Sequence, residues 1–242
     1  MSRIFSVLAI IALLTLSANF LLGLGIGDFN ATAQRYVAAA RENSRLQARD
    51  VRREEKQQVV DEFTAAGAAF AAPRRNLTLH FYLGVASSLL AILVCSISVT
   101  YFIGTSRWCR EVAETYQLSP EFIQRSDLLK RRTFPYALLG IFTVIVIVAL
   151  GGLSDPSIPW RRAFETEKGW FNTTFPPASM VNIHYIAAMV GLLVLGFAFW
   201  IQASRIAANY GIIDEILAEV HRIRSERGLS TEENVVKAES QI

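Results

Sequence analysis

The chain has 242 residues, of which 52% are hydrophobic and only 19% are charged, and its mean hydropathy is +0.32. An ordinary soluble domain carries about 25% charged residues, and here the charges fall between long uncharged blocks, as expected where lipid solvates part of a chain. This pattern excludes an ordinary soluble domain. The net charge of +3 is better explained by basic residues that flank membrane spans than by a nucleic-acid partner. No nucleic-acid partner is expected.

Four uncharged apolar runs reach the length of about 20 residues that crosses a bilayer. They are Ile4–Gly27, Leu77–Thr105, Thr133–Leu153 and Val181–Ala203. The sequence therefore predicts an all-α membrane protein, a four-transmembrane-helix bundle with an outer helical segment and a cytoplasmic helical C-terminal extension. The first run exceeds the apolar core of about 7–15 residues in a signal peptide, which favours an uncleaved anchor.

These runs divide the chain into eight predicted segments. In order they are transmembrane helix 1 (1–27), an outer helical segment (28–76), transmembrane helix 2 (77–105), a cytoplasmic loop (106–132), transmembrane helix 3 (133–153), an outer loop rich in aromatic residues and proline (154–180), transmembrane helix 4 (181–203), and a cytoplasmic helix and tail (204–242). The lipid bilayer is thus the first expected partner.

The orientation follows from the excess of basic residues in cytoplasmic loops. Between spans two and three lie Arg107, Arg110, Arg125, Lys130, Arg131 and Arg132, whereas between spans three and four lie only Arg161, Arg162 and Lys168. Both termini are therefore predicted in the cytoplasm, in a bacterial inner (plasma) membrane. Arg74 and Arg75, just before span two, favour the opposite orientation.

The outer segment 28–76 is rich in Ala, Arg, Glu and Gln and has neither Gly nor Pro before Gly67 and Pro73. This composition predicts helix, arranged as a hairpin of two helices, because the apolar positions keep no clean heptad. The second outer segment, 154–180, is expected to lie along the membrane interface as a lid.

After span four an apolar seam continues on a predicted cytoplasmic helix that ends near Gly228. Its residues, spaced by 4, 3, 4 and 3, are Ile206, Tyr210, Ile213, Leu217 and Val220. A seam of about two heptads is typical of a short coiled coil or of a helix packed on another segment of its own chain. It favours either self-association or packing on the inner loop.

The four runs contain no Asp, Glu, Lys or Arg, so His80 and His184 are their ionisable groups of functional interest. Ionisable residues inside a membrane are costly and point to function. Each histidine lies three or four residues into an outward-to-inward span, which predicts similar depths. Each also heads a stripe of small residues, comprising Gly84, Ser87, Ala91, Cys95 and Ser98 in one case and Ala188 and Gly191 in the other.

Two interpretations of this pair remain open. In the first, spans two and four hold a haem b whose iron takes His80 and His184 as axial ligands, the metal being bound only through the haem. The expected propionate partners are Arg74, Arg75, Arg161 and Arg162, and the neighbouring polar candidates are Thr78, Asn182 and Tyr185. In the second, both histidines are interfacial residues without a metal, and the small stripes pack helices together.

Two functions follow from these interpretations. One is a haem b-binding electron-transfer subunit of a larger membrane complex. The alternative is a non-catalytic scaffold, assembly or sensory protein acting through its outer and cytoplasmic helices, with a protein partner or self-association. No Ser/His/Asp or Cys/His constellation lies outside the spans, so the chain is not expected to be an enzyme on its own.

Overall fold

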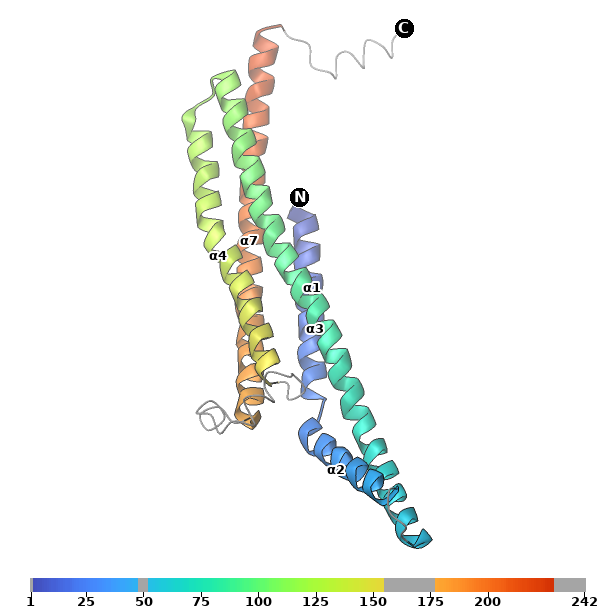
Figure 1. The fold of residues 1–242 in the computed structure, drawn as a ribbon. Coiled ribbons are helices and arrows are strands. Elements are labelled where there is room, and N and C mark those ends of the chain that lie inside the picture. The colour runs from blue at the N-terminus through green and yellow to red at the C-terminus, as the bar shows by residue number, and fades with distance from the viewer. Residues whose placement is uncertain (1, 48–51, 155–176, 229–242) are drawn as a thin grey trace, which may run out of the picture. The chain divides into compact units, whose positions relative to one another are not determined.

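The structure is a computed structural model that describes residues 2–47, 52–154 and 177–228. These residues form five helices and no strand (Figure 1). The helices are α1 (Ser2–Leu24), α2 (Phe29–Gln47), α3 (Arg53–Tyr116), α4 (Pro120–Ser154) and α7 (Pro177–Glu226). The predicted all-α class is confirmed for the described residues. The outer loop rich in aromatic residues falls almost entirely on residues 155–176, outside them.

Four of these helices, α1, α3, α4 and α7, are long and apolar enough to cross a membrane. Their exposed surfaces carry large apolar side chains, such as Leu14 (65% exposed), Phe142 (62%) and Leu193 (72%). In water such surfaces would be costly, whereas in a bilayer they contact lipid. The four predicted apolar spans are thus present as helices.

The predicted cytoplasmic loop, 106–132, is helical except at residues 117–119. Helix α3 ends where Gln117 takes a positive φ of 56° and the Leu118 N–H donates to the Ala113 carbonyl at 2.9 Å. Helix α4 begins with Ser119 as its cap, because its hydroxyl accepts from the Glu121 N–H at 3.3 Å and Pro120 takes the first helical position. The charged residues therefore end the apolar run but do not end the helix.

The chain forms two compact units, each with residues from α1, α3, α4 and α7. The first comprises Met1–Ile11, Leu90–Val144 and Leu193–Ile242. Beyond the apolar stretches, Cys109 of α3 and Ile212 and Ile216 of α7 form part of a buried cluster. A bidentate ion pair joins Arg125 of α4 to Glu215 of α7 at 2.6 and 2.9 Å. The C-terminal helix therefore packs on the segment between spans two and three.

The predicted seam on α7 is only partly used in this packing. Ile206 and Val220 are buried, but Tyr210 is 55% and Leu217 is 41% exposed. Asn209 and Ile216 occupy the buried stripe in their place. The buried face of α7 therefore differs from the predicted seam. Asn209 belongs to this buried face, but a search for apolar residues at heptad spacing passes over a polar residue.

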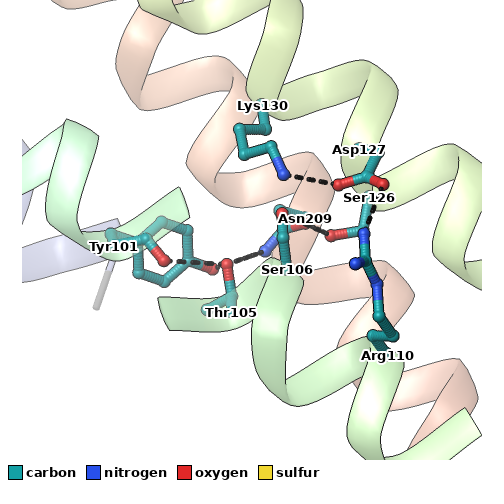
Figure 2. Close-up of polar contacts among 8 residues, drawn as sticks. All are labelled: Tyr101, Thr105, Ser106, Arg110, Ser126, Asp127, Lys130 and Asn209. Atoms are coloured by element: carbon teal, nitrogen blue, oxygen red, sulfur yellow. Dashed lines mark hydrogen bonds and ion pairs between the residues drawn. The ribbon is translucent and has the colours of Figure 1, made fainter. Parts of the chain in front are cut away.

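The amide of Asn209 links three helices, as Figure 2 shows. The Ser126 hydroxyl of α4 donates to its Oδ1 at 3.2 Å, and its Nδ2 donates to the Tyr101 and Thr105 hydroxyls of α3 at 3.3 and 3.1 Å. Asn209 is fully buried, and a buried amide without partners would cost stability. With these bonds it fixes the register of α7 against α3 and α4.

The second unit comprises Ala12–Leu89 and Ile145–Leu192. Within it, α2 lies along the first part of α3 (Figure 1) through aromatic rings. The Tyr36 ring stacks on Phe63 at 5.5 Å and on Phe70 at 5.4 Å between centroids. Asp28 caps α2 by accepting from the Ala31 N–H at 3.0 Å. The two helices expected in the outer segment are present, but α3 continues without a break through Pro73.

Replacing Tyr36 with Ala should open the α2–α3 pairing locally. Its two ring contacts contribute about 1–3 kcal/mol together, so the segment between Arg35 and Glu62 should be cut faster by trypsin under native conditions. The matched control is Val37→Ala, because Val37 is the next residue and is exposed. Equal cleavage rates for the two variants would contradict the role of Tyr36.

Candidate functional site

The side chains of His80 and His184 are neighbours in the second unit. Their ring centroids lie 6.3 Å apart and the ring planes meet at 79°. His80 comes from α3 and His184 from α7, and both are half-buried. The two histidines that the sequence singles out, 104 positions apart in the chain, therefore share one site.

Each histidine ring packs against a glycine of another helix. A Cβ added to Gly23 of α1 would lie 2.9 Å from Cε1 of His80, and one added to Gly151 of α4 would lie 3.0 Å from Cε1 of His184. Carbon atoms prefer about 3.5–4.0 Å. Only glycine allows the rings to lie this close, so α1, α3, α4 and α7 all meet at this site.

Backbone hydrogen bonding fixes the orientation of His80. Its Nδ1 lies 3.0 Å from the Asn19 carbonyl, and because a carbonyl only accepts, Nδ1 carries the proton. In the neutral ring, Nε2 then keeps its lone pair. Histidines that bind a metal are commonly held in this way by a carbonyl or carboxylate.

The orientation of the His184 ring is fixed by fewer hydrogen bonds than that of His80. Its Nδ1 is buried and makes no hydrogen bond of normal geometry within the described residues, although the backbone of Ile147 of α4 lies close to it. The adjacent Tyr185 donates from its hydroxyl to the Gly23 carbonyl at 2.8 Å, which links α7 to α1. The two imidazoles therefore have unequal surroundings despite their similar sequence contexts.

The small residues that follow the histidines contact other helices. A Cβ on Gly84 would lie 3.0 Å from Nδ2 of Asn19 in α1. Ser87, Ala91, Cys95 and Ser98 are all buried, and a Cβ on Gly140 of α4 would lie 2.7 Å from Cys95 Sγ. These contacts are the close helix packing that small residues permit in membranes.

Of the four predicted propionate partners, the structure describes two, and no contact joins either of them to a histidine. Arg74 and Arg75 are exposed and border a shallow hollow of α3, about 120° and 140° around the helix from His80 at 3.6 residues per turn. Arg161 and Arg162 fall outside the described residues. Of the neighbouring polar candidates, Thr78 and Asn182 are exposed, whereas Tyr185 contributes to the site.

Sequence reasoning did not identify the residues that hold the rings. Asn19 acts through its backbone carbonyl, which no side-chain pattern reveals. Gly23 belongs to the run Gly23-x-Gly25-x-Gly27, and Gly151 starts the pair Gly151-Gly152 near the end of the third apolar run. The signal in the sequence is a glycine near the end of one apolar run, at the same predicted depth as a histidine in another run. Such a glycine predicts a close contact with the histidine ring.

No family model, curated protein or solved structure matches the chain. In the part of the chain that the structure describes, no group of three or more His, Cys, Asp or Glu side chains is close enough to hold a metal ion. The two histidines are therefore neighbours without a third side chain of these types close enough to complete a metal site among the described residues.

A Gly23→Ala substitution should displace the His80 ring and weaken its bond to the Asn19 carbonyl. Overpacking of this kind costs about 1–3 kcal/mol, measurable as a lower thermal unfolding midpoint in detergent. Gly196→Ala is the matched control, since Gly196 lies within α7 and a Cβ there would meet nothing within 4 Å. An unfolding midpoint for Gly23→Ala equal to or above that of Gly196→Ala would refute the contact.

Proposed function

We propose that the protein binds one haem b between His80 and His184 and passes electrons within the membrane as a subunit of a larger complex. The 6.3 Å between the two ring centroids is the observation that carries the proposal. Two histidine rings from separate helices that lie this close could together hold one haem iron, and haem iron is commonly held by histidine.

The chemistry of the donor set supports the same proposal. Two neutral imidazoles suit haem iron, which when bound supplies one-electron chemistry. The carbonyl of Asn19 orients His80 so that Nε2 is the free nitrogen, and a hydrogen bond of this kind raises the basicity of a ligating imidazole.

The proposed place of the protein is a bacterial inner membrane with both termini in the cytoplasm. The six basic residues between spans two and three support this orientation. The histidines then lie near the outer surface, so electrons enter or leave at that side. One haem gives one redox centre, and electron transfer therefore requires a donor and an acceptor from partner proteins or quinones.

His80→Ala and His184→Ala variants should each lose the b-type α-band in a reduced-minus-oxidised visible spectrum. The protein is purified in detergent after expression with ample haem, and the expected change for each variant is near-complete loss, because either change removes one of two axial ligands. His221→Ala is the control, since His221 is exposed on α7. A wild-type spectrum without the band would falsify haem binding and leave the pair as helix packing.

The second candidate is the non-catalytic scaffold, assembly or sensory role, through self-association of α7. Tyr210 and Leu217 are exposed, seven residues apart on one side of this helix beyond its apolar span. Deleting the whole helix would not test this role, because Ile206, Asn209 and Ile216 are buried within the chain. Substitutions of exposed residues test self-association of α7 without disturbing its packing inside the chain.

For this candidate, a Tyr210→Ser/Leu217→Ser double variant should lower the mass of the protein in detergent from that of an oligomer to that of a monomer. Two apolar contacts per chain make the expected loss of affinity about tenfold or more. Ala207→Ser/Asp214→Ser is the matched control, with the same spacing on exposed positions. A monomeric wild-type protein, or an equal change in the control, counts against self-association through this surface.

A further inference from the structure

A hollow between α3 and α4 in the first unit combines apolar and basic side chains. Its volume is about 310 Å³, and its lining includes Ile103 and Phe134 together with Arg107, Arg110 and Lys130. Figure 2 shows Arg110 and Lys130 bonded to the Asp127 carboxylate. Neither the proposed haem site nor the α7 surface uses these residues.

The hollow lies where both apolar runs end. Ile103 is near the end of the run 77–105 and Phe134 is near the start of the run 133–153, whereas the three basic residues lie just beyond these runs. In a bilayer this boundary is the headgroup level, so one part of the hollow borders hydrocarbon and the other borders water.

Three cations at the hollow share two carboxylates. Lys130 Nζ lies 2.6 Å and Arg110 Nη2 lies 3.3 Å from Asp127, and Arg107 Nε lies 2.8 Å from Glu111. Lys130 and Arg110 hold the pKa of Asp127 below its usual value, so this carboxyl is ionised at neutral pH. One positive charge remains in excess, and the further exposed cations Arg131 and Arg132 lie next to Lys130 in sequence.

The arginines can turn to an added anion at little cost. The Arg107 side chain is 81% exposed and that of Arg110 is 55% exposed, and exposed ion pairs contribute only about 0–1 kcal/mol. Guanidinium groups bind phosphate oxygens in bidentate geometry, and the lysine ammonium acts as a point charge. The hollow thus complements a phosphate group at the membrane boundary.

We propose that this hollow binds the phosphate headgroup of an anionic phospholipid, with Arg107, Arg110 and Lys130 on the phosphate and the acyl chains along Ile103 and Phe134. Basic sites between membrane helices at this level suit anionic headgroups. Free phosphate would use the cations but gain nothing from the two apolar side chains. A zwitterionic phospholipid would use the apolar surface, but its own cation would oppose the excess positive charge.

The test is a titration of the full-length protein in detergent with phosphatidylglycerol, followed by native mass spectrometry. Phosphatidylcholine and inorganic phosphate are the comparison probes. The Arg107→Gln/Lys130→Gln variant should bind phosphatidylglycerol about 30-fold more weakly, from the combined attraction of the two removed cations to anionic lipid. Asp127 keeps Arg110 as a partner in this variant, and an unchanged unfolding midpoint checks that it is folded.

The matched control is Arg131→Gln/Arg132→Gln, which removes the same charge at the same level from exposed positions outside the lining. It should retain binding within about twofold, as expected if the charges act only through short-range contact. Equal weakening in both variants would overturn the site in favour of general charge attraction. Equal affinity for phosphatidylcholine, or displacement of the lipid by millimolar phosphate, would overturn the anionic lipid as its occupant.

Discussion

The distance at which neighbouring helices approach one another controls the rest of this structure. Lipid tails are as apolar as leucine, so burial of apolar side chains does little to hold membrane helices together, and close packing at small residues must do so. Here Gly23 meets His80, Gly151 meets His184 and Gly140 meets Cys95, each at a distance that a Cβ would make too short. Glycine on one helix thus accommodates a larger side chain from another.

Close approach also allows polar side chains to lie between the helices. Asn209 and His80 reach groups on other helices, and the Tyr185 hydroxyl of α7 reaches the Gly23 carbonyl of α1. Hydrogen bonds between membrane helices contribute only about 0.6 kcal/mol on average. Their larger effect is on register, because a shifted helix would bury the same polar atoms without partners, which is costly wherever they are shielded from water. The packing of each unit is therefore specified by a few polar groups in an apolar surface.

The sequence predicts the four apolar helices because a bilayer imposes a length and an absence of charge that composition reports directly. It also predicts similar depths for His80 and His184, but not that their rings are neighbours, because depth does not fix which way each side chain points around its helix. It does not predict that helix continues through 106–116 and 120–132, because charged residues interrupt an apolar run without interrupting backbone hydrogen bonding. The register of α7 is missed for a related reason, since buried Asn209 is invisible to an apolar pattern.

The asymmetry between the two histidines follows from backbone contacts that side-chain patterns do not encode. His80 is fixed by the Asn19 carbonyl, by Gly23 and by the ring of His184. The conformational entropy of its imidazole is therefore lost when the protein folds. Binding of a ligand to this imidazole would cost little further side-chain entropy. His184 has the same glycine contact but no hydrogen bond of normal geometry at Nδ1 within the described residues. The orientation of its ring therefore depends on packing against Gly151 and the neighbouring backbone of Ile147, whereas that of His80 is also set by a hydrogen bond.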